Sequence, residues 1–150
     1  MERELTFEEA LMKCQFLAAK SECCEYDLVQ KMQRWNVPHN VITQVIDSLV
    51  EEKFVDNLRF AIAYVRDKTR FNHWGRIKTT MMLRQKRVQQ SIIDQAFAEL
   101  PAHDYFKAFD FEKCKKLKQL KNLPPFEQRR KTASYLIQRG FEPDYVFKEL

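Results

Sequence analysis

Glycine is scarce in this chain: only Gly75 and Gly140 occur among 150 residues, together with five prolines. A many-stranded sheet needs frequent turns, and such turns are rich in glycine and proline. The shortage therefore favours an all-helical fold. It also excludes a glycine-rich phosphate loop or a dinucleotide fingerprint, because each motif needs more glycines than the chain has.

Long apolar runs and paired cysteine motifs are missing as well. No apolar run approaches 18 residues, the first five residues are mostly charged, and the four cysteines include no Cys-x-x-Cys pair. These features predict a cytoplasmic protein with reduced thiols and no membrane partner. A zinc site from Cys23, Cys24 and one histidine is disfavoured because the ligand spacing is wrong.

Catalytic motifs are also missing. No serine or cysteine stands in a recognisable nucleophile motif. Acid pairs such as Glu8-Glu9 and Glu51-Glu52 are expected at helix ends or on solvated faces. The sequence therefore predicts a protein that is not an enzyme, with no catalytic residues, no cofactor and no metal site.

Apolar spacing and capping residues predict nine helices. Thr6 and Glu9 form a capping box, Asn72 is expected to cap the fifth helix, and Gly140 is expected to end the eighth. The expected helices lie near residues 6–20, 25–35, 38–53, 56–70, 72–86, 89–100, 104–120, 126–139 and 143–150.

A pattern of five positions recurs three times with spacings of 4, 5, 5 and 4 residues. The copies are Leu28, Met32, Val37, Ile42 and Ile46; Thr79, Leu83, Val88, Ile93 and Phe97; and Thr132, Leu136, Phe141, Val146 and Leu150. The pattern crosses a junction between two helices, which the 3.6-residue period alone does not explain. It predicts three tandem three-helix repeats (1–53, 54–100 and 101–150) in one elongated, curved and monomeric array.

Charge is divided unevenly along the chain. Residues 1–60 hold 7 Lys/Arg and 11 Asp/Glu, a net −4, whereas residues 61–150 hold 19 and 10, a net +9. A basic part suggests a polyanion or an acidic protein surface as partner. The alternative is that these cations form an ordinary solvated surface of a helical protein.

Fifteen cations of the second and third repeats are the candidate contacts. They are Arg66, Lys68, Arg70, Arg76, Lys78, Arg84, Lys86, Arg87, Lys115, Lys116, Lys118, Lys121, Arg129, Arg130 and Lys131. The last three open the eighth helix, where cations oppose the helix dipole at a cost of about 0.3–1 kcal/mol. This unfavourable placement indicates a binding role, unless the helix starts later or Glu127 offsets the charges.

Aromatic residues accompany the first of these cations. Phe54, Phe60, Tyr64, Phe71 and Trp74 are interpreted either as a platform on which bases stack or as core residues. Helical spacing favours the core, and Phe60 and Trp74 are expected to pack inside or between repeats.

The stretch from Phe54 to Ala61 (FVDNLRFA), followed by Tyr64-Val65, resembles the signature of the RecX regulators of RecA recombinase. The segments 74–78 and 83–88 resemble that family's second repeat, and 136–141 its third. The resemblance covers essentially the whole chain. The signature residues Phe54, Asp56, Arg59, Phe60, Ala61, Trp74 and Gly75 are expected to be structural, with Asp56 and Arg59 paired across the turn.

Four positions depart from the family pattern. Lys53 and Arg87 replace usual glycines, Asn57 replaces an acid, and Thr79 replaces an aliphatic residue. The change at Arg87 puts a glycine-type helix end there in question, while the fold is expected to be kept.

The resemblance implies a bacterial, non-enzymatic protein that binds in the groove of the RecA–DNA filament. There it would inhibit or otherwise modulate ATP hydrolysis, strand exchange and co-protease activity, and so act in recombination, DNA repair and the SOS response. Some members also touch DNA. Two other hypotheses stay open: a direct binder of single- or double-stranded DNA, and a helical interaction scaffold, neither with a RecA role.

Overall fold

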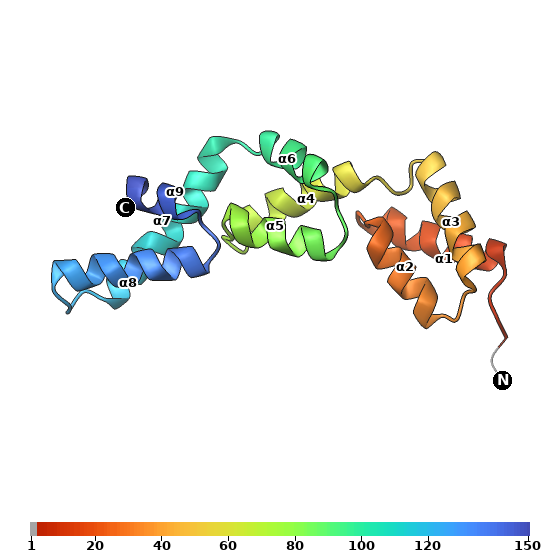
Figure 1. Cartoon of the computed structure of the whole chain (residues 1–150), viewed down its shortest axis with the longest axis horizontal. Coiled ribbons are helices and arrows are strands. Elements are labelled where there is room, and N and C mark those ends of the chain that lie inside the picture. Colours follow the sequence, from red (N-terminus) through yellow and green to blue (C-terminus); the bar gives the residue numbers. More distant parts are fainter. Residues whose placement is uncertain (1–2) are drawn as a thin grey trace.

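The computed structural model describes residues 3–150, which form nine α-helices and no strand. The helices are α1 (Phe7–Lys20), α2 (Glu25–Arg34), α3 (His39–Glu51), α4 (Asn57–Arg70), α5 (Arg76–Gln85), α6 (Gln90–Ala98), α7 (Ala102–Gln119), α8 (Pro125–Gln138) and α9 (Pro143–Glu149). They follow one another in three groups along the longest axis (Figure 1). The expected all-helical, elongated repeat array is confirmed.

Each group of three helices has its own hydrophobic core. The first group is α1–α3, the second α4–α6 and the third α7–α9. Fourteen of the fifteen positions in the repeated pattern are buried, and the fifteenth, Leu150, is partly buried in the third core. The sequence period therefore marks the residues that pack each group, including the residue at the junction of its last two helices.

Most helix ends follow the expected signals. Thr6 and Glu9 make the capping box at the start of α1, and Gly140 has a φ of +97° just beyond α8. The cap predicted at Asn72 is wrong, because α5 begins at Arg76 with Gly75 as its N-cap. The Arg139 side chain donates to the carbonyls of Asn72 and His73, so this segment serves as a turn that α8 holds in place.

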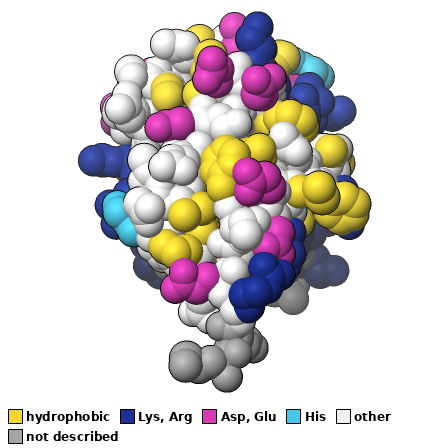
Figure 2. Space-filling model, turned by 90° about the vertical axis from the view of Figure 1, so that its right-hand side faces the viewer, with side chains coloured by type: hydrophobic (Ala, Val, Ile, Leu, Met, Phe, Trp, Pro, Cys, Tyr) yellow, Lys and Arg dark blue, Asp and Glu magenta, His cyan; other side chains and the backbone are white. Residues whose placement is uncertain are grey.

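The N-terminal end of the array carries the acidic part of the sequence. Figure 2 looks onto this end, where Asp and Glu side chains are interspersed with hydrophobic ones and most Lys and Arg lie toward the edges. No helix in residues 3–150 is long and apolar enough to cross a membrane.

Candidate partner-binding surface

The fifteen candidate cations fall into three classes in the structure. Five of them lie within ion-pair distance of a carboxylate: Arg66 with Asp67 (3.3 Å), Arg70 with Asp104 (2.7 Å), Arg76 with Asp94 (3.3 Å), Lys86 with Asp27 (2.9 Å) and Lys115 with Glu112 (3.6 Å). Two of these pairs connect different groups. Lys86 reaches α2 of the first group, and Arg70 reaches α7 of the third.

A second class of cations lies over aromatic rings. Lys68 and Lys78 have their Nζ atoms 4.9 and 4.6 Å from the ring centre of Trp74. Arg87 lies over Tyr26 and Lys116 over Tyr135. Such contacts contribute about 0.5–1 kcal/mol at exposed sites. They give these cations a structural role and leave part of each charge facing solvent.

The remaining six candidates are exposed and have neither kind of partner among the described residues. They are Arg84, Lys118, Lys121, Arg129, Arg130 and Lys131. Five of the six lie where the end of α7 and the start of α8 form a helical hairpin, at the far end of the array from the N-terminus (Figure 1). We call Lys118, Lys121, Arg129, Arg130 and Lys131 the basic tip.

Three residues of the basic tip do not oppose the dipole of α8 as predicted. Helix α8 begins at Pro125, and its first turn contains Glu127. Arg129, Arg130 and Lys131 therefore lie beyond the first turn, where the dipole effect has faded. Their exposure, and the lack of carboxylate partners in the part of the chain that the structure describes, are better reasons to consider them for binding.

The signature stretch holds the first and second groups together. Asp56 Oδ1 accepts from the backbone N–H groups of Leu58 and Arg59 at 2.9 and 3.0 Å, and so caps α4. The expected Asp56–Arg59 side-chain pair is wrong. Arg59 Nε instead donates to Glu22 at 2.6 Å, and its Nη2 donates to the carbonyls of Lys53 and Phe54.

Asn57 makes a contact that sequence reasoning missed. Its Oδ1 accepts from the backbone N–H of Glu25 at 3.1 Å, and its Nδ2 donates to the Glu25 carboxylate at 2.8 Å. The side chain thus caps α2, 32 residues earlier. An ionised acid at this position could not donate to Glu25. The departure from the family pattern at Asn57 was therefore the one hint in the sequence that this side chain makes a contact of its own.

The aromatic residues beside the signature divide between core and surface. Phe60 and its neighbour Ala61 are buried, and Trp74 is half-buried. Phe71 is 75% exposed and packs in no core cluster of the described residues. The expectation of a core role therefore fails for Phe71.

The second and third groups meet through both glycines of the chain. Gly75 N–H donates to the carbonyl of Arg139 at 2.9 Å, and Ile77 N–H donates to that of Gly140 at 2.9 Å. A Cβ on Gly75 would collide with the backbone of Gly140, and a Cβ on Gly140 would collide with Lys78. Only glycine allows this approach of the two backbones.

A buried carboxylate reinforces the same contact. Glu112 of α7 has a 4% exposed side chain that accepts from the Tyr135 hydroxyl at 2.7 Å and lies 3.4 Å from Arg139 and 3.3 Å from His73 Nδ1. Burial by itself raises the pKa of Glu112, but the Tyr135 hydrogen bond and the neighbouring cations outweigh it. The pKa is held below its ordinary value, so the carboxylate is ionised near neutral pH.

Tyr105 connects three helices at this contact. Its hydroxyl accepts from Arg76 N–H at 2.9 Å and donates to Glu142. Burial, followed by the hydrogen bond to Glu142, raises the pKa of Tyr105. The phenol therefore stays protonated and joins the starts of α5 and α9 to α7.

The described residues offer no group of three or more metal-ligating side chains. Burial raises the pKa of Cys14 and of Cys24 to about 11. A neutral buried thiol is a poor nucleophile and a poor metal ligand. These two cysteines act as small core residues.

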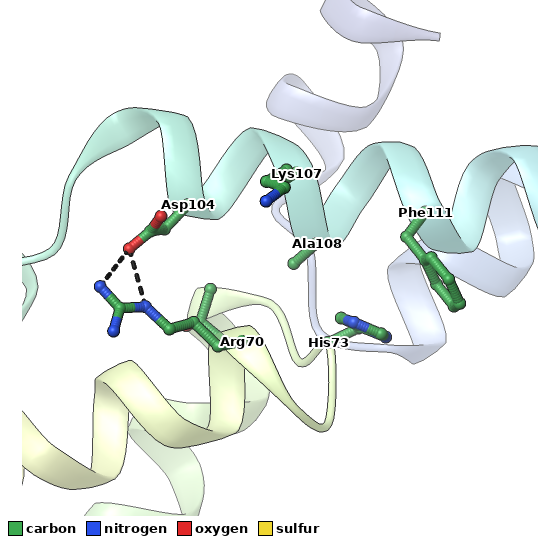
Figure 3. A pocket seen from close by; sticks show the side chains of 7 residues that line it. Arg70, His73, Asp104, Lys107, Ala108 and Phe111 are labelled. Carbon is green, nitrogen blue, oxygen red and sulfur yellow. Dashed lines mark hydrogen bonds and ion pairs between the residues drawn. The ribbon is translucent and has the colours of Figure 1, made fainter.

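A cavity of about 290 Å³ lies between the end of α4 and α7. Figure 3 shows Arg70 and Asp104 at one end, His73 and Phe111 at the other, and Lys107 and Ala108 on the α7 side between them. Of these residues, only Arg70 was a candidate from the sequence. The cavity depends on the packing of α4 against α7, which no local pattern reveals.

Comparisons with known proteins agree on one family. The model of the second three-helix domain of RecX matches residues 56–96, and that of the third matches residues 109–149. The regulatory protein RecX of Vibrio campbellii is 31% identical over 87% of this chain and 82% of its own. That of Vibrio parahaemolyticus is 32% identical over 81% and 76%.

A solved structure agrees with the fold. RecX from Lactobacillus salivarius superposes with a TM-score of 0.83 over 96% of both chains, at 14% sequence identity. The two matched segments lie within the second and third groups, and the similarity to the Vibrio proteins extends over most of the chain. The chain belongs to the RecX family of regulatory proteins.

Proposed function

We propose that this protein binds in the groove of the RecA–DNA filament and inhibits or otherwise modulates ATP hydrolysis, strand exchange and co-protease activity. Membership of the RecX family gives a regulatory role. The basic tip is the observation that supports the finer proposal. It sets five exposed cations, none within ion-pair distance of a carboxylate in residues 3–150, at one end of a long helical array. The DNA phosphates of a filament would attract such an end.

The other candidate cations support the proposal in a different way. Lys86 and Arg70 pair with carboxylates of neighbouring groups, so both ion pairs help to fix the array. An array fixed in this way presents its distant surfaces at a constant separation. Preorganisation of this kind lowers the entropic cost of binding.

Co-sedimentation with RecA filaments on single-stranded DNA tests the proposal. The double variant Arg129→Glu/Arg130→Glu should bind at least about tenfold more weakly, because two attractive charges become repulsive. The matched control is Lys13→Glu/Lys20→Glu, which reverses two exposed charges of α1 and should bind like the unmodified protein. Equal binding by the Arg129/Arg130 variant, or no binding by the unmodified protein, would contradict the proposal.

Direct DNA binding without RecA is the second candidate, favoured by the net charge of +9 in residues 61–150. It predicts tight binding to DNA alone. The binding constant should fall with salt with a slope of about −0.7 to −0.9 per neutralised phosphate. Weak binding to DNA in the absence of RecA would count against it.

A further inference from the structure

The cavity between α4 and α7 carries a guanidinium that is already oriented. Arg70 donates from Nε and Nη2 to Asp104 Oδ2, at 2.9 and 2.7 Å, as the dashed lines in Figure 3 show. Nη1 takes no part in these two bonds, so its N–H groups remain available to a ligand. The Asp104 charge is offset by Arg70, and the pair spans two helices.

Lys107 adds an uncompensated charge on the α7 side of the cavity. It is exposed and lies within ion-pair distance of no carboxylate among residues 3–150. With Asp104 neutralised by Arg70, the cavity keeps a net positive charge from Lys107. A negatively charged group is therefore the ligand that this end of the cavity favours.

Aromatic surface forms the other end of the cavity. His73 and Phe111 have ring centres 4.5 Å apart, and Phe111 is 55% exposed although it is a large apolar side chain. An exposed ring beside cations suits a ligand that combines a flat ring with negative charge. The single-stranded nucleic acid chain has both, because its unpaired bases offer ring faces.

A second cavity adjoins the first along α4. Arg70 also lines a smaller cavity of about 140 Å³ with Arg66 and Glu99. Arg66 lies one helical turn before Arg70 on the exposed side of α4. Arg66, Arg70 and Lys107 thus extend along the seam between the second and third groups.

One hydroxyl of the first cavity is buried without a hydrogen-bond partner among the described residues. Thr69 lines it, is 0% exposed, and its Oγ1 has no hydrogen-bond partner among the described residues. Buried polar groups are normally paired. The orphaned hydroxyl is a further polar group on the cavity wall.

We infer that this cavity binds a nucleotide of single-stranded nucleic acid, with its phosphate at Arg70 and Lys107 and its base against Phe111. The inference rests on the proposed function, since it assigns a strand contact to a protein that acts at DNA-bound filaments. It differs from the basic tip in location and chemistry. The tip is an open surface on which Phe126 is the exposed ring, whereas the cavity sets Arg70, Lys107 and the Phe111 ring around one hollow.

Fluorescence anisotropy of a labelled oligothymidylate, without RecA, tests the site. Phe111→Ala should weaken binding about 5- to 150-fold, the range expected for loss of one base–aromatic stack. Lys107→Gln should weaken binding and lower the salt slope by about 1. An abasic oligomer should bind the Phe111→Ala variant and the unmodified protein equally, because it has no base to stack.

Matched controls come from α9. Phe147→Ala removes a ring that is also 55% exposed, and Lys148→Gln removes an exposed charge; both should bind like the unmodified protein. Circular dichroism checks that every variant is folded.

Unchanged oligonucleotide binding by folded Phe111→Ala and Lys107→Gln would overturn the site. So would equal losses in the α9 controls, or equally tight and equally Phe111-dependent binding of a phosphorylated peptide. The effect on RecA is measured separately: no effect from the unmodified protein contradicts the proposed function, whatever the oligonucleotide result.

Discussion

Five residues of the described chain adopt a left-handed backbone, and only one of them is glycine. They are Asn36, Lys53, His73, Arg87 and Gly140. Asn36, Arg87 and Gly140 occupy the same place in the three groups. In each, the next residue donates its N–H five residues back, as Val37 does to Met32 at 3.0 Å. Arg87 therefore keeps a glycine-type helix end without glycine.

Lys53 is strained by the same geometry. Its φ is 63°, which costs a residue with a Cβ about 1–2 kcal/mol. Lys53→Gly should raise the free energy of unfolding by about 0.5–1 kcal/mol, because glycine removes that strain but is freer in the unfolded chain. Urea unfolding measures this change in the free energy of unfolding. Lys53→Ala is the control and should change little; equal stabilisation by alanine would mean that backbone strain is not the cause.

Asn57 should not tolerate the acid that the family pattern places there. Asn57→Asp removes the donor to Glu25 and sets two carboxylates against each other, so we expect a loss of about 1–3 kcal/mol in urea unfolding. Adding Glu25→Gln restores a donor and should recover most of the loss. If the double variant is no more stable than Asn57→Asp alone, the Asn57–Glu25 contact does not explain the effect.

At this scale the sequence predicted local contacts better than distant ones. The capping box of Thr6 and Glu9 lies within four residues, and its chemistry is readable from spacing. The partners of Asn57 and Arg59 lie 32 and 37 residues away. The spacing of residues along the chain cannot reveal such distant partners, and the Asp56–Arg59 pair was therefore wrongly predicted.

At the scale of helices, apolar period and turn residues predicted all nine elements to within a few residues, apart from the start of α5. That start depends on Arg139 and Gly140 of α8 and its C-terminal turn, so no local pattern could place it. The repeated pattern also identified the core, because the same positions are buried in each group. The candidate cavity could not be predicted, since it arises where α4 packs on α7.

Gly75 should be essential to the contact between α5 and the α8–α9 turn. Gly75→Ala places a methyl group against the backbone of Gly140, which cannot rotate away as a side chain can. We expect a loss of about 1–3 kcal/mol, the usual cost of overpacking, measured by urea unfolding. Ser134→Thr, which adds a methyl group at an exposed position of α8, is the control. Unchanged stability of Gly75→Ala would rule out the close approach of the two backbones.

Glu112 should make the stability of the contact between the second and third groups depend on pH. Its pKa is lowered in the folded protein, so its ionised form stabilises the fold above the unfolded pKa of about 4.3, and this stabilisation is lost as the pH falls through the lower folded value. Glu112→Gln should cost about 1.5–3 kcal/mol at pH 7.

The difference between Glu112→Gln and the unmodified protein should shrink steadily below about pH 4.3. Unfolding is followed from pH 7 to pH 3, with Glu127→Gln as a control on the neighbouring helix. A difference that stays constant over this range would contradict the role given to the ionised carboxylate.

At the scale of the whole molecule, charge and shape act together. The sequence showed an acidic part and a basic part, but it could not distinguish which of the fifteen candidate cations are available to a partner. In the folded chain several of them form ion pairs or lie over aromatic rings, whereas the basic tip stays exposed at the end remote from the N-terminus. Which cations remain available is a property of the assembled array.

Hydrolysis of ATP by RecA on single-stranded DNA tests the central claim most directly. The proposal predicts that the rate falls as the protein is added up to stoichiometric amounts. It also predicts that Arg129→Glu/Arg130→Glu lowers the rate far less than Lys13→Glu/Lys20→Glu does. A rate that stays unchanged with stoichiometric unmodified protein would contradict the claim.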